Sequence, residues 1–423
     1  MHSTYDLAPA LLRHGYRAIA RAREPHGREQ DVFVSRLLGR RTVVVRGDLG
    51  ARLLYDEQRI RRQGAVPRAL AALLFGRDAV HGLDGAAHRA RKRIFLDLLT
   101  PDSVDALAGE VDRGLGRAMT EWALTPSTRL HDGLVRVYGD AVLAWAGTAC
   151  AGSESEDVSR DLAAIVAGFG FAGSAYPRAW RARRRADAWA RDRVLRARRG
   201  DLKPPEGTAL HAFSLGAGAS LPVSVAAVDL LNVLRPTVAV SWLAPFAVLS
   251  LSQHPEWGRA LLAPDGDRAL EAFAHEVRRR TPFVPALTGL ATTPFRAGSH
   301  EVRVGDRLLL DVPGTNLHAD SWPSPTDFRP ERFLVEEPGP YRFVPQGGGG
   351  PHGHRCPGEG VTTALLTTTL RHFARARFTL VSPDVRTDTM PTLPSGGLVV
   401  RDLVLGANTG GTSTPPNGAA QQL

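Results

Sequence analysis

The stretch GHRCPGEG, residues 353–360, places one cysteine among glycine, proline and histidine residues. It follows PQGGGGPH, so the thiol of Cys356 lies in a glycine-rich loop whose backbone can approach a bound group closely. A helical pattern, VTTALLTTTLRHFARARF (361–378), comes next, and we expect this helix to begin near Pro357. Backbone N–H groups and the positive end of that helix would then stabilise a thiolate at Cys356.

Three kinds of site use loops of this composition. Alternating His352, His354 and Cys356 are potential zinc ligands, but structural zinc takes four ligands in paired spacings that the stretch lacks. A phosphate-binding loop needs the lysine and the Ser/Thr of G-x-x-x-x-G-K-[ST], which are also missing here. The third kind is a haem whose iron takes the cysteine thiolate as axial ligand, an arrangement that favours cleavage of an O–O bond.

Patterning outside the loop indicates a fold that is mainly α with a small β part. Residues 32–47, VFVSRLLGRRTVVVRG, place two β-branched runs about a glycine and predict a β-hairpin. Helical periodicity dominates from there to about residue 280, whereas residues 291–314 have the pattern of strands and turns. Proline and glycine make residues 315–358 an ordered coil.

The chain of 423 residues, 43% of them hydrophobic, suits one large helical domain over residues 1–405. Residues 406–423, GANTGGTSTPPNGAAQQL, cannot bury a core and are expected to form a disordered tail. The longest apolar segment is 221–251, but its uncharged part after Arg235 has only about 16 residues, fewer than the ~20 that span a bilayer. We therefore expect a long buried helix there and no membrane span.

The charge and the cysteines suggest a cytoplasmic protein. Its net charge is +10, but only two of its basic residues are lysines and the arginines are scattered, so we expect no nucleic-acid binding. The dense run RAWRARRRADAWARDRVLRARRG (178–200) predicts mainly a solvated helix face, with an interaction patch as the alternative. Cys150 and Cys356 do not form a disulfide framework, and the first residues lack the pattern of a signal peptide.

Two further motifs connect the cysteine loop to a known family. Glu276 and Arg279 form an E-x-x-R in EVRR, and FRPERF (328–333) follows about 50 residues later with Arg332. In this order, the motifs and the cysteine loop resemble those of a cytochrome P-450. The resemblance implies that a haem b lies between a long central helix and the loop, and that Cys356 is its axial ligand. It also implies that Glu276, Arg279 and Arg332 pair and brace the loop.

The central helix departs from the usual pattern of this family, which has an acid followed by an alcohol. Here it reads NVLRPTVAVSW (232–242), with Arg235 and Pro236 in that region. An unpaired charge in an apolar helix is costly, and Asp229, six residues back, points to another side. Arg235 therefore faces solvent or a haem propionate, or it holds the carboxylate of a substrate bidentately. Pro236 removes a backbone hydrogen bond and is expected to bend the helix.

The Arg-Pro pair and the cysteine loop resemble one branch in particular, the bacterial fatty-acid peroxygenases. FGRDAVHGLDGAAHRARKRIF (75–95) and LLLDVPGTNLHADSWPSPTDFRPERF (308–333) resemble it too. The resemblance implies that the substrate carboxylate, clamped by Arg235, replaces the missing acid in the cleavage of hydrogen peroxide. It implies α- or β-hydroxylation or oxidative decarboxylation of a fatty acid, with no obligatory redox partner. The alternatives are a conventional monooxygenase that needs ferredoxin or reductase and oxygen, and a non-catalytic haem-binding protein.

Six more residues receive roles from this resemblance. His88 and Lys92 match the helix that reaches the haem propionates. His81 and Phe75 match positions above the haem near the carboxyl end of the substrate, although His81 can also be a loop histidine without a role. Two aromatic residues are expected to line the substrate channel: Phe169 and Phe171. Ordinary core residues would give the same aromatic pattern.

Overall fold

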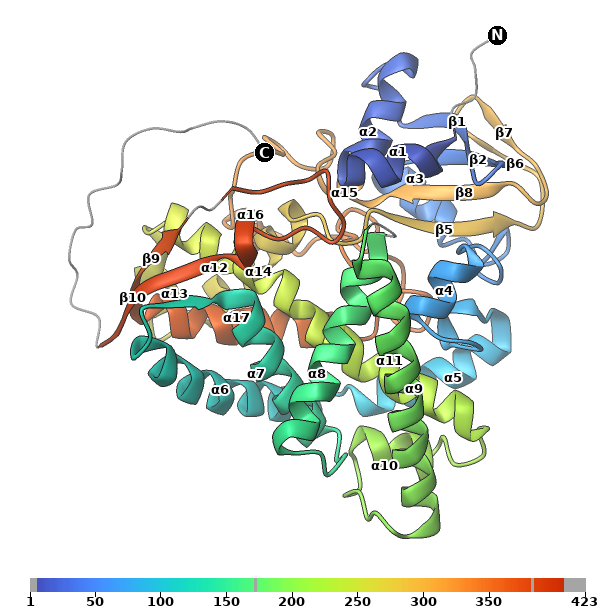
Figure 1. The fold of residues 1–423 in the computed structure, drawn as a ribbon. Helices are drawn as coiled ribbons and strands as arrows, with labels where there is room; N and C mark the ends of the chain where they lie inside the picture. The colour runs from blue at the N-terminus through green and yellow to red at the C-terminus, as the bar shows by residue number, and fades with distance from the viewer. Residues whose placement is uncertain (1–5, 171–172, 382–383, 407–423) are drawn as a thin grey trace.

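The computed structural model describes residues 6–170, 173–381 and 384–406, and most of them are helical (Figure 1). The mainly α architecture with a smaller β part agrees with the prediction. The predicted tail lies outside the described residues except for Gly406, and Phe171 lies outside them as well. The β-strands β1, β2 and β5–β8 gather with the first helices at one corner, and the remaining helices form the larger body.

The helices form this body and a smaller group near the strands. Those of the body are α4 (Arg68–Leu74), α5 (Gly85–Leu98), α6 (Pro101–Ala123), α7 (Leu130–Trp145), α8 (Gly152–Ala167), α9 (Ala175–Arg199), α10 (Ala209–Ser214), α11 (Val223–Ala239), α12 (Ala244–Gln253), α13 (Trp257–Leu261), α14 (Asp267–Arg280) and α17 (Glu359–Ala374). Shorter helices are α1 (Leu7–His14), α2 (Ala18–Arg23), α3 (Gly47–Leu54), α15 (Val312–Asn316) and α16 (Arg332–Val335). Short 3-10 turns used below are η1 (Gly15–Arg17), η3 (Val80–Gly82), η4 (Gly168–Gly170) and η5 (Val240–Trp242).

The largest sheet has five strands in the order β1-β2-β8-β5-β3, in which only the β2–β8 pair is parallel. Its strands are β1 (Val32–Leu37), β2 (Arg40–Val45), β3 (Ile60–Arg61), β5 (Ala286–Ala291) and β8 (Arg307–Asp311). A second sheet contains β4 (Ser127–Arg129), β9 (Ala376–Val381) and β10 (Val399–Leu405), and a hairpin contains β6 (Phe295–Ala297) and β7 (His300–Val302). The predicted hairpin at 32–47 is confirmed as β1–β2.

The central apolar segment forms two helices rather than one. Helix α11 ends at Ala239, the turn η5 follows, and α12 begins at Ala244 with Pro245 in its first turn. Proline has no N–H to donate, so the segment restarts as a new helix at this point. By length and composition the span Val223–Gln253 could cross a membrane, but 83% of its apolar window is buried inside the protein, as is typical of a core helix.

The helix after the cysteine loop ends earlier than predicted, because its last predicted residues pair in a sheet. Helix α17 begins at Glu359, close to the predicted start, but it ends at Ala374, and residues 376–381 form β9. The predicted helix over 361–378 is therefore wrong at its carboxyl end. The alternation of partly buried Phe378 with exposed Arg377 and Thr379 fits a strand, and β9 pairs with β10 over this stretch.

The arginine-rich run forms most of α9, and its outer face is solvated as predicted. Two of its arginines are buried instead: Arg183 pairs with Asp187 at 2.7 Å, and Arg193 pairs with Glu154. A buried cation needs such a partner, because desolvation without one is costly. For Arg183 and Arg193, the prediction of a solvated face is wrong.

Candidate active site

A cavity of about 1070 Å³ is lined by residues of the cysteine loop, of the Arg235–Pro236 pair and of α5. Its wall includes Cys356 from the loop before α17, Lys92 from α5 and Arg235 from α11. From there it extends between the strands and α4 to exposed residues of α1 and of the β1–β2 turn. The cavity therefore joins the cysteine loop to the surface of the protein.

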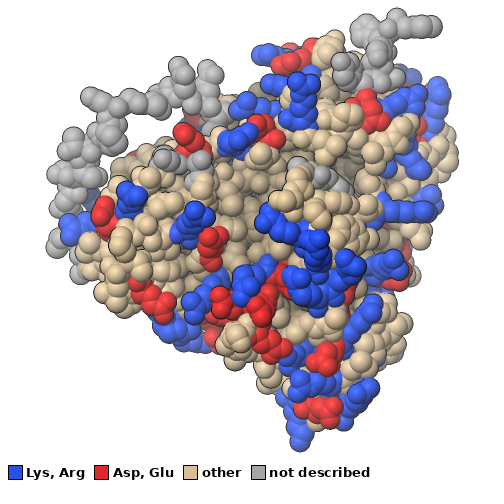
Figure 2. Space-filling model, in the orientation of Figure 1, with Lys and Arg blue, Asp and Glu red and all other residues tan. Residues whose placement is uncertain are grey.

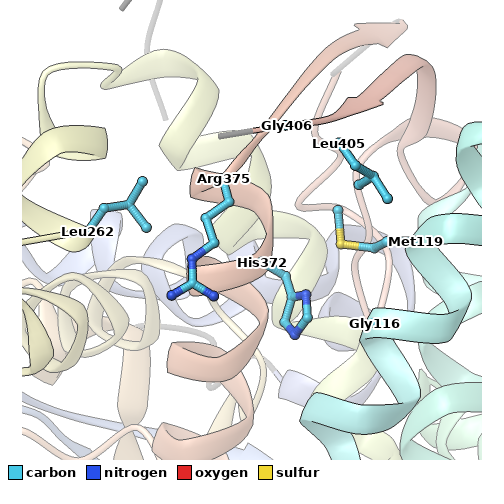
Figure 3. Close-up of a pocket in the computed structure, with 7 residues that line it drawn as sticks. All are labelled: Gly116, Met119, Leu262, His372, Arg375, Leu405 and Gly406. Carbon is cyan, nitrogen blue, oxygen red and sulfur yellow. The ribbon is translucent and has the colours of Figure 1, made fainter. Parts of the chain in front are cut away.

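A second pocket, of about 500 Å³, lies where α6, α17 and β10 meet (Figure 3). Arg375 in its wall is exposed, and His372 contacts Asp112 at 2.9 Å, so the described residues of this pocket include no buried cation and no thiol. Its lining is Gly116, Met119, Leu262, His372, Arg375, Leu405 and Gly406. Since the reactive groups converge in the larger cavity, we take that cavity as the candidate active site.

Cys356 lies at the inner end of the cavity, fixed by its backbone. Its N–H donates to the carbonyl of Gln346 at 3.1 Å, and Lys92 donates to the carbonyls of Gly353 (3.1 Å) and Arg355. Burial raises the pKa of the Cys356 thiol, while the N–H of Gly358 and the charge of Lys92 act in the opposite direction. The loop is thus tied to α5 and presents its sulfur to the cavity beside donors that stabilise a thiolate.

This donor set fits a haem iron better than zinc. Among the described residues, no three His, Cys, Asp or Glu side chains gather as metal ligands. The ring of His354 stacks on that of His88 at 3.9 Å, and His354 also approaches Asp84 at 3.5 Å. A single sulfur ligand from the protein suits a haem iron, because the porphyrin nitrogens supply most of the other ligands. The zinc interpretation therefore has no support in the described part of the chain.

The E-x-x-R and the P-E-R-F motifs meet in a buried cluster. Arg279 pairs bidentately with Glu276 at 2.7 and 2.8 Å, and Nε of Arg332 lies 3.3 Å from the same carboxylate. Glu276 is fully buried and also accepts from the N–H of Arg329 at 2.9 Å. Arg279 donates further to the carbonyl of Asn316. The expected contacts are present, and they tie α14 to the coil before the cysteine loop.

The direct link from α14 to the cysteine loop comes from Arg278, a residue that the sequence analysis did not select. This buried guanidinium donates to Oε1 of Gln346 at 2.7 Å and pairs with Glu359 at 2.5 Å. Glu359 in turn pairs with Arg355 at 2.7 Å. Arg278 therefore bonds to residues on both sides of Cys356. The predicted cluster of Glu276, Arg279 and Arg332 instead contacts the coil that precedes the cysteine loop.

Arg235 is a buried cation without a carboxylate partner in the described residues. Its side chain lines the cavity, its exposed fraction is 8%, and its guanidinium donates weakly to Oδ1 of Asn232 at 3.4 Å. Within the part of the chain that the structure describes, its Nε has no hydrogen-bond partner. Burial and then the charge of Arg183 lower the pKa of Arg235 to about 9, so it remains charged at neutral pH. This burial contradicts the solvent-facing alternative for Arg235.

Phe75 and His81 lie beside this guanidinium. Their rings stack at 4.1 Å, and the guanidinium carbon of Arg235 lies 5.9 Å from the ring centroid of Phe75. The His81 ring lines the cavity and is open to the solvent inside it, while protein atoms surround the cavity at this point. Burial, followed by the charge of Arg235, lowers the pKa of His81 to about 3. The imidazole is therefore neutral near pH 7, and one of its nitrogens carries a proton.

The turn that carries Phe75 is held from two helices by residues that the sequence analysis did not select. Asn232 donates from Nδ2 to the carbonyl of Phe75 at 2.8 Å, and Arg183 donates to the carbonyl of Leu74 at 3.3 Å. A Cβ at Gly76, where φ is +90°, would lie 2.4 Å from Nη2 of Arg183. Asn232 precedes Arg235 by three residues on the same helix face, and that spacing was a usable signal.

The other predicted residues have these positions. His88, Lys92, Phe169 and Pro236 all line the cavity, and Pro236 lies inside α11. Asp229, which the helix geometry had separated from Arg235, pairs with Arg91 of α5 at 2.8 Å. This pair links α11 to the helix that carries His88 and Lys92.

The comparisons with known proteins agree with this arrangement. The family model for cytochrome P-450 matches residues 268–401. The putative cytochrome P-450 137 of Mycobacterium tuberculosis is 32% identical over 138 residues, which are 32% of this chain and 28% of the relative. The putative cytochrome P-450 138 of Mycobacterium bovis is 23% identical over 325 residues, 71% of this chain and 73% of the relative. The chain thus aligns with only about a quarter of the first of these curated relatives.

Solved structures match over almost the whole chain. Cytochrome P-450SP alpha (CYP152B1), in complex with (R)-ibuprophen, is 34% identical, with 95% of this chain and 99% of that chain covered and a TM-score of 0.88. Ligand-free cytochrome P-450 OleT is 27% identical, covers 96% and 99%, and has a TM-score of 0.91. Cytochrome P-450EX alpha (CYP152N1) with myristic acid is 32% identical, covers 96% and 98%, and has a TM-score of 0.89.

Proposed function

Because the chain belongs to the cytochrome P-450 family, in the CYP152 branch, we propose that it is a haem-thiolate peroxygenase acting on fatty acids. It uses hydrogen peroxide to hydroxylate the α or β carbon or to decarboxylate the acid oxidatively. The observation that carries this proposal is Arg235, a buried cation that lines the cavity and has no carboxylate partner in the described chain. Related structures contain myristic acid and arachidonic acid, which supports an acid of this class as the partner of Arg235.

The cofactor is haem b, held by groups at the inner end of the cavity. Cys356 would supply the thiolate that binds the haem iron, and His88 and Lys92 of α5, which line the same cavity, would hold the charged edge of the macrocycle. When bound, the haem supplies the iron chemistry that cleaves peroxide and oxidises a C–H bond. Arg278 keeps Gln346 and Glu359 in place around the loop, so the sulfur keeps its position.

The protein's own contribution is to bind, orient and protonate. The guanidinium of Arg235 offers two parallel N–H donors, which fix a carboxylate bidentately and bring its α and β carbons to a set place. The bound carboxylate acts as the acid–base group that the central helix lacks. The neutral imidazole of His81, which stacks on Phe75, donates a hydrogen bond from its ring N–H to that carboxylate or to a water beside it. Phe75 covers the guanidinium, and Pro236 follows it in the helix.

The partners are therefore a carboxylic acid and hydrogen peroxide, with no obligatory redox protein. A cytoplasmic location remains a proposal that rests on the two cysteines and the composition. A conventional monooxygenase of this family would need reductant and oxygen instead, so the two functions differ in the co-reactants that turnover requires.

The test is a turnover assay on the purified, haem-loaded protein. Saturated acids from octanoic to arachidic acid are each supplied with hydrogen peroxide alone, or with ferredoxin, reductase, NADPH and oxygen in the presence of catalase. We expect hydroxy acids or terminal alkenes with peroxide alone, and none with the second mixture. Turnover that requires the reductant mixture would identify a conventional monooxygenase, and a protein inactive in both would be a haem-binding protein only.

A further inference from the structure

The outer end of the cavity carries two exposed leucines. Leu12 on α1 is 56% exposed and Leu38 in the β1–β2 turn is 62% exposed, and both line the cavity. Other large apolar side chains are exposed in the described chain, such as Leu124 and Val335, but none of them lines this cavity. Single exposed leucines are ordinary on a protein surface. Two at the mouth of the substrate cavity call for a more specific explanation.

Leu38 is also held in a conformation that does not suit it. The two-residue turn has φ values of +53° at Leu38 and +75° at Gly39, the left-handed region in which Asn and Gly are favoured and leucine is strained. Backbone strain of this kind persists only where the surroundings impose it, and it gathers at functional places. A leucine at this position therefore has a use other than forming the turn.

One carboxylate imposes this geometry. Asp6 accepts from the N–H of Leu38 at 3.1 Å and from that of Gly39 at 2.7 Å, and it also caps α1 by accepting from Ala8 at 2.9 Å. The same side chain thus fixes the start of α1 and the tip of the hairpin. As a result, Leu12 and Leu38 are held together at one opening.

Several arginines lie on the segments that carry the two leucines, from α1 to α2 and along the β1–β2 hairpin. These arginines, all exposed, are Arg13, Arg17, Arg21, Arg36 and Arg40. Two of them, Arg17 and Arg36, act electrostatically on the carboxylates of Asp388 and Asp6. Where their hydrogen bonds are defined, the acceptors are uncharged: Arg17 bonds to Thr387, Arg21 to His14, and Arg36 to the carbonyl of Gly39. Within the described chain none of the five forms an ion pair, whereas their neighbours Arg23, Arg28, Arg41 and Arg46 all do. Figure 2 shows basic side chains, with some acidic ones among them, at the corner of the molecule that holds α1 and α2.

We propose that this mouth docks on the surface of an anionic phospholipid bilayer, with Leu12 and Leu38 inserted at the level of the first acyl carbons and the arginines at the phosphates. Apolar tips inside a basic rim are the combination that peripheral membrane binding requires, since neither signal alone holds a protein firmly. A flat protein partner would instead need a continuous apolar centre, and here arginines are interleaved with the leucines. The proposal rests on the proposed function only for its consequence, that a fatty acid enters the cavity directly from the lipid.

The test is sedimentation of the full-length, haem-loaded protein with vesicles of phosphatidylcholine alone or of equal parts phosphatidylcholine and phosphatidylglycerol. We expect binding to the anionic vesicles at about 0.05 M salt, a loss at about 0.5 M, and little binding to the neutral ones. Two variants probe the mouth: Leu12→Ser with Leu38→Asn, and Arg13→Gln with Arg21→Gln. Each should lower the bound fraction at least about fivefold.

Matched controls separate docking from general attraction by the net charge of +10. Leu124→Ser removes a leucine that is 84% exposed elsewhere, and Arg181→Gln with Arg191→Gln removes two exposed arginines from α9. Both should bind within about twofold of the unchanged protein. Equal losses in mouth and control variants, equal binding to neutral vesicles, or no binding at all would overturn the proposal.

Leu38→Asn by itself gives a second readout. Asparagine tolerates the left-handed conformation, so this variant should unfold at a higher temperature than the unchanged protein while it binds vesicles more weakly. If the protein turns over fatty acids with peroxide but does not bind vesicles, the proposed docking surface is wrong and the proposed function stands. Vesicle binding without turnover would do the reverse.

Discussion

Replacement of Arg235 by alanine should weaken the binding of a fatty acid far more than that of the corresponding fatty alcohol. In the unchanged protein the buried guanidinium has no carboxylate partner in the described chain, so its charge is available to the ligand. A hydrogen bond to a charged group contributes roughly 1.5–3 kcal/mol. Since 1.4 kcal/mol is tenfold in affinity, the acid should lose about tenfold to a hundredfold, and the alcohol little more than about twofold.

The assay is a four-way comparison of dissociation constants for palmitic acid and hexadecanol with the unchanged protein and with Arg235→Ala, by displacement of a fluorescent fatty acid. The ratio of ratios isolates the coupling between the carboxylate and the guanidinium from any general change in the cavity. Arg235→Lys should recover only part of the coupling, because an ammonium lacks the planar fork. If acid and alcohol lose the same affinity, Arg235 is a structural residue that only supports Phe75 and Asn232, and the reasoning fails.

The same comparison has a pH dependence whose sign follows from the pKa of Arg235, lowered to about 9 by burial and by Arg183. Below this value the guanidinium is protonated and attracts the carboxylate; above it the charge is lost. The preference for acid over alcohol should therefore be full near pH 7 and decline as the pH rises through about 9, or somewhat higher because the bound carboxylate raises this pKa. Affinity for the alcohol should not follow this curve.

Three further substitutions, the first of them with a matched control, test other parts of the site. Cys356→Ala should abolish the thiolate-type absorbance of the carbon monoxide complex together with turnover, whereas Cys150→Ala should keep both; a retained spectrum in the first variant would end the thiolate assignment. Glu276→Ala leaves buried guanidinium groups unpaired, a loss of about 3–5 kcal/mol, so the variant should yield little soluble, haem-loaded protein, and a normal yield would contradict a structural role. His81→Gln should change the ratio of alkene to hydroxy acid while peroxide consumption continues, and an unchanged product ratio would return His81 to a loop residue without a role.

The site residues that could be predicted from the sequence are those that belong to short motifs in a recognisable order. The loop around Cys356, the Glu276–Arg279 spacing and the Arg235–Pro236 pair each carry their chemistry within a few residues. Arg235 could be selected because it is a charged residue inside an apolar helix. Burying such a charge costs free energy unless a partner of opposite charge binds it. The mainly helical fold with a β-hairpin at 32–47 followed from periodicity in the same local way.

What could not be predicted depends on contacts between distant segments. The hydrogen bond from Asn232 to the carbonyl of Phe75 joins residues 157 positions apart, and the ion pair of Arg91 with Asp229 joins residues 138 apart. Local sequence does not encode such pairings. The helix after the cysteine loop gave way to β9 because its last residues pair with β10, so tertiary pairing overrode a helical pattern.

The central claim is that the carboxylate of the substrate, held by Arg235, is the acid–base group of the reaction. Its most direct test supplies the unchanged protein with hydrogen peroxide and either palmitic acid, its methyl ester, or a small neutral substrate such as styrene with and without heptanoic acid. We predict oxidation of palmitic acid, none of the ester, and oxidation of styrene only when the short acid is present. Equal rates for the neutral substrates without any acid would contradict the claim.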